Sequence, residues 1–205
     1  VLEMPAETLL SGINNSLFAT ANEEVRMVMN GIYFDIKPDH LIFASTDGKK
    51  LVKNIVHTVQ AGYESNFILP KKVAAIIKSI ITKDEGNIRI MYTFDRATIT
   101  TEDLTLHFRL IEGNYPNYNA VIPASNPNKV LIDRVEFVNG IKRVAVCSNP
   151  STNLIRMDIA DNKVNLTAQD IDFSVSANET ISCSYDGQPV TIGFKSTFLV
   201  EILSN

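Results

Sequence analysis

The sequence predicts an α+β protein made of two tandem, similar domains, each with two helices and several strands. Two observations predict this fold class. The order helix, several strands, helix occurs twice along the 205 residues. Local sequence matches also recur between the halves, and a period longer than about 100 residues indicates duplicated domains rather than a solenoid.

Three pairs of short segments match between the two halves of the chain. Both long helices carry a glycine in the middle, two strands end at an aspartate, and two others run directly into a helix that opens with a basic residue. The aligned segments are Ser11–Ile13 with Asn139–Ile141, Leu41–Asp47 with Val164–Asp170, and Ile68–Lys71 with Ile192–Lys195.

Four segments show helical periodicity, with apolar residues three and four positions apart. Pro5 suits a first turn, and Gly12 inside the first helix should cost about 1 kcal/mol relative to alanine. The predicted helices are 5–21, 70–81, 133–147 and 196–203. Their expected buried stripes are Leu9, Leu10, Ile13, Leu17 and Phe18; Val73, Ala74, Ile76, Ile77, Ile80 and Ile81; Val135, Phe137, Val138, Ile141 and Val144; and Phe198, Leu199, Ile202 and Leu203.

The remaining periodic segments read as strands separated by polar turns. Asn30-Gly31 interrupts the first of them, which predicts a bulge or a close backbone approach. Asp47-Gly48 between two apolar runs predicts a tight turn, because glycine adopts the positive φ that other residues resist. The predicted strands are 25–36, 41–44, 51–59, 65–69, 87–94, 97–101, 104–110, 129–132, 154–159, 163–168, 171–177, 180–185 and 190–194.

Residues 112–128 hold three prolines and five asparagines, a composition that excludes a long regular element. We therefore place a domain boundary there, giving domains 1–124 and 125–205. Strands follow the second helix in the first domain, whereas the second domain stops at its second helix. We expect the chain to be a fragment of a longer protein, truncated in its second domain.

Composition limits the function classes. The net charge of −4 argues against a protein that coats nucleic acid with its whole surface but leaves room for a local basic face. Cys147 and Cys183 form no CxxC motif, which suits a reducing cytosol and leaves open a single bridge between them. No signal peptide and no apolar run of roughly 18 residues is present, so we expect a cytoplasmic protein without a membrane partner.

An enzyme is the main rival class, and a β-rich adhesion or scaffold module is the second. The sequence contains no GxxxxGK[ST], GxSxG or HExxH motif. His40, His57 and His107 lie in turn and strand contexts without metal-ligand spacing. We therefore expect no catalytic residue, no metal and no cofactor.

Five segments in register carry a resemblance to a known family. They are Val25–Arg26, Met29–Gly31, Ser45–Leu51, Glu112–Tyr118 and Ile192–Phe194. With them the chain resembles the bacterial sliding clamp, the β subunit of the replicative DNA polymerase III. The resemblance implies a DNA-clamp fold of three similar domains per subunit, each with two helices on one face of antiparallel sheets. It also implies a homodimeric ring around duplex DNA when the protein is full length, and a role as processivity factor. Residues 1–124 would be the middle domain and 125–205 most of the third.

The resemblance also implies that two helices per domain face the DNA. Basic side chains there would meet phosphates without reading sequence. The loop 22–24 carries two acids and no aromatic residue, so we leave it out of the DNA-facing set. The implied DNA-facing residues are Lys71, Lys72, Lys78, Lys142, Arg143 and Lys195.

In this family the polymerase, the clamp loader and repair proteins bind through short peptides in a pocket between the middle and third domains. Lys195 would lie at its rim. The sequence departs from the common pattern at Lys49-Lys50, where a His-Arg pair is frequent, and at Ala120, where an arginine occurs. The implied pocket residues are Met29, Gly31, Thr46, Gly48, Lys49, Lys50, Leu51, Pro116, Val121 and Phe198.

Overall fold

The computed structural model describes residues 1–205. The chain divides into two compact units, Val1–Ile122 and Pro123–Asn205. All pairings between strands are antiparallel, and each unit carries two helices packed on sheet strands, so the predicted α+β architecture is confirmed.

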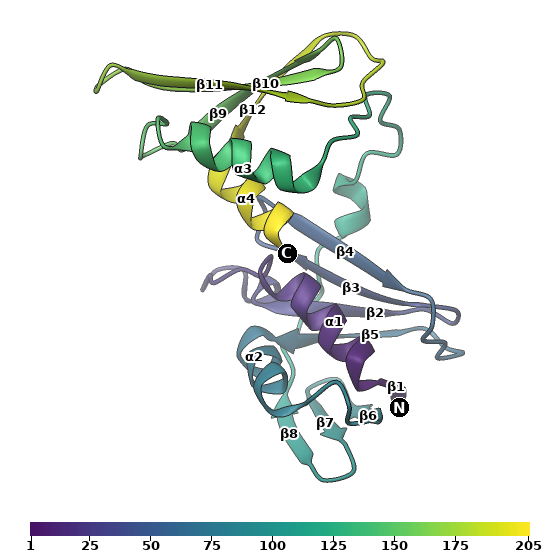
Figure 1. Ribbon diagram of the computed structural model, residues 1–205. Coiled ribbons are helices and arrows are strands. Elements are labelled where there is room, and N and C mark those ends of the chain that lie inside the picture. Colours follow the sequence, from purple (N-terminus) through teal and green to yellow (C-terminus); the bar gives the residue numbers. More distant parts are fainter. The chain divides into compact units, whose positions relative to one another are not determined.

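Unit 1 contains two sheets around one core. The strand orders are β1-β6-β7-β8 and β4-β3-β2-β5. In Figure 1, α1 lies across the second sheet, where it packs on β2, β3 and β4, while α2 packs on β2 and β5. The elements are β1 (Leu2–Pro5), α1 (Ala6–Leu17), β2 (Gly31–Ile36), β3 (Leu41–Thr46), β4 (Leu51–Val56), β5 (Ser65–Pro70), α2 (Lys71–Ile80), β6 (Asn87–Tyr92), β7 (Arg96–Thr100) and β8 (Thr105–Arg109), with 3₁₀ turns η1 (Met27–Met29) and η2 (Tyr118–Val121).

Every residue of β3 is buried, because both faces of the sheet are covered. Alternate side chains serve the two sides, as strand geometry requires. Leu41 and Phe43 belong to the main core with α1 and α2. Ile42 and Ala44 face a smaller cluster with Tyr118. The strand therefore joins the main core to the surface on which the candidate site lies.

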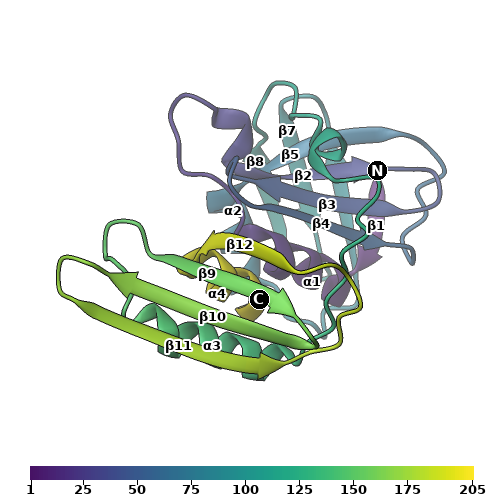
Figure 2. The ribbon, with the colours of Figure 1, turned by 90° about the horizontal axis from the view of Figure 1, so that it is seen from above.

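Unit 2 repeats the sheet of unit 1 in the same order. Its strands run β11-β10-β9-β12, which matches β4-β3-β2-β5 element for element along the chain. Figure 2 shows α3 along one face of this sheet, where it packs on β9, β10, β11 and α4. The elements are α3 (Arg134–Ala145), β9 (Leu154–Ala160), β10 (Lys163–Asp170), β11 (Val175–Ser182), β12 (Val190–Lys195) and α4 (Ser196–Ser204).

The two aligned helix glycines have the same structural role. A Cβ on Gly12 would lie 2.4 Å from the ring of Phe43, and one on Gly140 would lie 2.5 Å from the terminal methyl of Ile181. Both helices therefore approach their sheets so closely that a side chain at either position would require Phe43 or Ile181 to move. The shared topology and these two contacts support the internal repeat.

Helices in both units follow strands without a connecting loop. Pro5 ends β1 and precedes α1 directly, and Pro70 does the same between β5 and α2. Both prolines have φ near −60°, the value that their rings fix. In unit 2, Lys195 ends β12 and Ser196 begins α4.

Four predicted strands differ from the structure in whole or in part. Residues 25–30 form a loop and η1, because this segment has no partner strand and its backbone is held by Asn30. The segment 129–132 contributes one isolated bridge, Leu131 with Ser184. The predicted strands 171–177 and 180–185 are one strand, β11, which runs through Asn178-Glu179 because an edge strand tolerates polar residues on its exposed face.

The helix limits and stripes differ in detail from the prediction. Leu2–Pro5 is a strand that the sequence analysis missed, and α1 ends at Leu17 rather than at 21. Ile76 and Ile80 on α2, Val135 on α3 and Ile202 on α4 are exposed. Each helix buries a narrower stripe than its apolar content suggests, since the sheet covers only one side of it.

Candidate functional site

A cavity of about 290 Å³ lies in unit 1 beside the turn between β3 and β4. Three segments distant in sequence form its walls: the end of η1, the turn itself, and the segment that follows β8. The lining residues are Met29, Thr46, Gly48, Lys49, Lys50, Leu51, Pro116, Asn117, Tyr118 and Val121.

The turn is held by the hydroxyl of Thr46. This Oγ1 donates to the carbonyl of Lys50 at 2.7 Å and accepts from the N–H of Gly48 at 3.0 Å. Gly48 has φ of +84°, in the region that glycine enters without strain. The backbone of this pocket wall is therefore fixed by one buried side chain.

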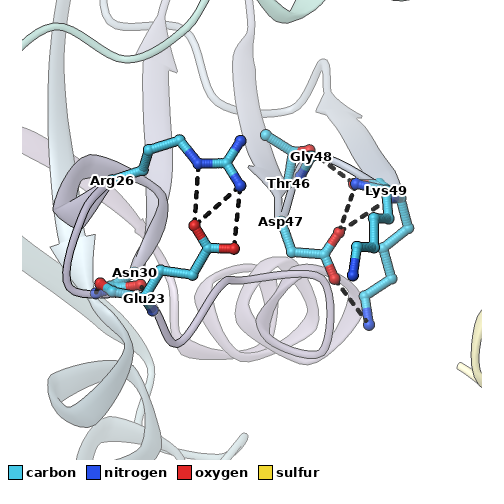
Figure 3. Close-up of polar contacts among 8 residues, drawn as sticks. Glu23, Arg26, Asn30, Thr46, Asp47, Gly48 and Lys49 are labelled. Atoms are coloured by element: carbon cyan, nitrogen blue, oxygen red, sulfur yellow. Dashed lines mark hydrogen bonds and ion pairs between the residues drawn. The ribbon is translucent and has the colours of Figure 1, made fainter.

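Asp47 closes the same turn from the other side (Figure 3). Its Oδ1 accepts from the N–H groups of Lys49 at 2.9 Å and Lys50 at 3.0 Å, and its Oδ2 lies 3.5 Å from Lys50 Nζ. Partial burial would raise the pKa of Asp47. The two hydrogen bonds and the lysine charge outweigh it and hold that pKa below its usual value. The carboxylate is thus engaged within the turn, and Lys49 remains exposed beside the cavity.

The opposite wall is fixed by two tyrosines after β8. The ring of Tyr115 stacks on Tyr33 at 4.7 Å and its hydroxyl accepts from the N–H of Thr46 at 3.0 Å. The hydroxyl of Tyr118 donates to Asp35 at 2.7 Å. Burial raises the pKa of Tyr115 to about 12. The first part of segment 112–128, which was predicted to be a linker, therefore packs as far as η2 on the β4-β3-β2-β5 sheet, on the side of Ile42 and Ala44.

The third wall comes from the loop before β2. Met29 is buried, and its neighbour Asn30 fixes the backbone of Glu23 through hydrogen bonds of 2.9 and 2.6 Å (Figure 3). Arg26 pairs with Glu23 and lies against Gly48, where an added Cβ would be 2.9 Å from the guanidinium. The loop thus contacts the β3–β4 turn directly.

The cavity suits an apolar ligand with a polar rim. Met29 and Leu51 supply apolar surface, and Val121 adds a side chain that is 71% exposed. Acid–base or nucleophilic chemistry would need groups that converge within hydrogen-bond reach, and no such set lines the cavity. Such an apolar site with a few polar groups is typical of ligand or peptide binding.

The structure brings most of the predicted pocket residues together in this cavity. Gly31 does not line it, since it is buried in β2 against the carbonyl of Leu69. Phe198 belongs to α4 of unit 2, where Lys195 Nζ lies 5.4 Å from its ring centre. The prediction missed Asn117 and Tyr118, although the tyrosine spacing in Glu112–Tyr118 was available as a signal.

The predicted DNA-facing residues differ in their surroundings. Lys72 and Lys78 are exposed on α2 and Lys71 is half-buried, and none of the three has an acidic partner within ion-pair distance. On α3, Lys142 is exposed. Arg143 forms two hydrogen bonds to Glu179, one of 2.9 Å, and they lower the pKa of that carboxyl. The positive charge of Arg143 is therefore largely compensated by Glu179.

Two family models match the chain in tandem. The DNA polymerase III beta subunit central domain matches residues 3–117 and its C-terminal domain matches residues 119–205. The chain belongs to the DNA polymerase III beta subunit family. No helix has the length and apolar character needed to cross a membrane.

Individual relatives agree with the family. The chain is 29% identical to the beta sliding clamp of Synechococcus elongatus and 26% identical to that of Haemophilus influenzae, in each case over 98% of this chain and 55% of the relative. It thus spans about half the length of the curated relatives it matches.

Solved structures share the fold. A DNA polymerase sliding clamp from Pseudomonas aeruginosa matches with a TM-score of 0.94 at 24% identity, covering 98% of this chain and 56% of that chain. A DnaN sliding clamp from Bartonella birtlesii, bound to griselimycin, matches with a TM-score of 0.89 at 25% identity over 98% and 55%.

Proposed function

We propose that this chain is part of a DNA sliding clamp, a non-catalytic processivity factor for the bacterial replicative polymerase. Residues 1–124 would act as its middle domain and 125–205 as most of its third domain. The observation that carries the proposal is the repeated sheet order β4-β3-β2-β5 and β11-β10-β9-β12, together with two family models matched in that order. In the full-length protein, two subunits would close a ring around duplex DNA in the cytoplasm.

Such a ring holds DNA by topology and needs no base readout, so weak phosphate contacts are sufficient. We propose Lys71, Lys72 and Lys78 as the main DNA-facing residues of unit 1, since they are the basic residues of α2 and lack acidic partners. Lys142 and Lys195 would contribute in unit 2. Arg143 ranks last because Glu179 already binds it.

The cavity beside the β3–β4 turn would bind short peptides from the polymerase, the clamp loader and repair proteins. Its volume of about 290 Å³ admits one or two apolar side chains, and the exposed Lys49 offers a cation to the peptide. Phe198 and Lys195, which belong to unit 2, stay predicted members of the peptide-binding set on the family resemblance alone.

Retention on DNA tests the ring. Full-length protein loaded on nicked circular plasmid should stay bound through gel filtration and be lost after the plasmid is linearised. An adhesion or scaffold module that binds DNA by charge alone would be retained equally on both forms, and that result would reject the clamp.

A peptide titration tests the pocket. In full-length protein, Leu51→Ala should weaken binding of a fluorescent peptide from a clamp-binding polymerase subunit about tenfold, which corresponds to about 1.4 kcal/mol. Ile55→Ala is the matched control, since Ile55 is a 42% exposed apolar residue on the same strand outside the cavity lining. Equal affinities in both variants would place the peptide elsewhere.

A further inference from the structure

Two histidines face each other at the open end of the β3–β4 hairpin. The antiparallel ladder runs from Thr46↔Leu51 at the turn to Leu41↔Val56. The next residues outward are His40 and His57, whose ring centroids lie 5.7 Å apart. Their separation in sequence hides this pairing, which the strand register creates.

An acidic neighbour orients one of the two rings. Nδ1 of His40 lies 2.7 Å from Oδ1 of Asp39. A carboxylate oxygen can only accept a hydrogen bond, so Nδ1 is the donor, and in the neutral ring Nε2 is the nitrogen with the lone pair. Metal-binding histidines commonly have this arrangement, in which a carboxylate holds the far ring nitrogen and fixes the tautomer.

The ring spacing fits one shared ion. Zinc binds imidazole nitrogen at about 2.0–2.1 Å with tetrahedral angles, which separates the centroids of two ligating rings by roughly 5 Å. The observed 5.7 Å between the ring centroids of His40 and His57 is close to that separation. His57 is exposed and the side chain of His40 is 24% exposed, so an ion has access from solvent.

We propose that His40 and His57 form a binding site for one divalent transition-metal ion of the zinc type, with water in the remaining positions. Nε2 of His40 and one ring nitrogen of His57 are the protein ligands, and Asp39 is a positioning residue. No group of three or more metal-ligating side chains converges here, so the site is a two-imidazole chelate. This site does not depend on the proposed clamp function.

Metal binding would crosslink the two strands of the hairpin at its open end. The ion links the residue before β3 to the residue after β4, and this geometry is absent from the unfolded chain. A ligand that binds only the folded state raises the thermal midpoint as its concentration increases. The expected signature is a zinc-dependent stabilisation that requires both rings.

The test is calorimetric titration of the 205-residue chain, without a histidine tag, with zinc chloride. We expect one ion per chain, and at least about tenfold weaker binding in His40→Ala and in His57→Ala. His107→Ala is the matched control, because His107 lies on β8 with its Nδ1 2.8 Å from Thr98 Oγ1 and should bind zinc like wild type. Asp39→Ala should weaken binding less than either ligand variant does.

Cysteine is the competing zinc ligand in this chain. Cys147 and Cys183 are both free thiols, so the same titration is run on the Cys147→Ser/Cys183→Ser variant, which should retain the site. Loss of zinc binding in that variant, no measurable binding to wild type, or unchanged binding in both histidine variants would each overturn the proposal. In wild type, the NMR signals of His40 and His57 should shift together with added zinc while those of His107 stay in place.

Discussion

Replacing Gly12 with alanine sets two effects of opposite sign against each other. Alanine is preferred over glycine in a helix interior by about 1 kcal/mol, which would stabilise α1. However, the new Cβ would lie 2.4 Å from the ring of Phe43, about 1 Å closer than an ordinary contact. Phe43 is fully buried and packs edge-on against Phe34 at 4.7 Å, so the ring has no free space to enter.

The packing effect should dominate. Overpacking of a filled core costs typically about 1–3 kcal/mol and occasionally more. A contact of 2.4 Å with a fully buried ring belongs to the upper part of that range, so after the propensity gain of about 1 kcal/mol we expect a net loss of about 1–2 kcal/mol in the stability of unit 1. Gly140→Ala should cost less, because the atom it meets is the terminal methyl of Ile181. The exposed Ser11→Ala, one position away, should be neutral or slightly stabilising.

Hydrogen exchange followed by mass spectrometry on the whole chain measures the effect in each unit separately. Peptides from β3 should lose protection in Gly12→Ala, and peptides from β10 should not. Phe43→Leu in the Gly12→Ala background should cost less than in wild type, which a double-mutant cycle measures. Unchanged or increased protection of β3 in Gly12→Ala would refute the claim that this glycine exists for close helix–sheet packing.

Three further predictions concern the pocket. Thr46→Val removes the hydroxyl that bonds the Lys50 carbonyl and a turn N–H, so we expect about 1–2 kcal/mol lower stability and severalfold weaker peptide binding by fluorescence anisotropy. Asp47 has a lowered pKa in the folded state. Its stabilising contribution is therefore present above its unfolded pKa of about 3.9 and is lost as pH falls through its folded pKa. Urea melts should show the stabilities of wild type and Asp47→Asn converging in that acidic range. Tyr118→Phe removes a buried bond to Asp35 and should cost about 1.5–3 kcal/mol, seen as faster exchange of η2; unchanged exchange would contradict the anchoring role of Tyr118.

Much of the site was predictable because turn chemistry is local. Asp47-Gly48 between two apolar runs specifies a tight turn by backbone preference alone, and the structure places that turn at a pocket wall. The repeated mid-helix glycines also carried long-range information, since a glycine in a helix is unfavourable unless something packs against it. Their matched positions indicated the internal repeat, and the close helix–sheet contacts that explain them are seen only in the structure.

The predictions were wrong where contacts with residues distant in sequence determine the local structure. Val25 to Asn30 alternates like a strand, but no neighbouring strand pairs with it, and the Asn30 side chain holds a loop instead. The proline- and asparagine-rich 112–128 has the composition of a linker, and only the tertiary contacts of Tyr115 and Tyr118 dock its first part. His40 and His57 meet through strand register, which sequence spacing does not reveal.

Because no loop separates β5 from α2, the strand fixes the orientation of the helix about its own axis. Since Pro70 ends one element and Lys71 begins the next, adding or deleting one residue at this junction would turn the helix by about 100°. Lys71 and Lys78 would then point in new directions while the strand stayed in place. Length changes at this point should accordingly be far less tolerated than changes at the exposed residues 82–84, which follow the end of α2.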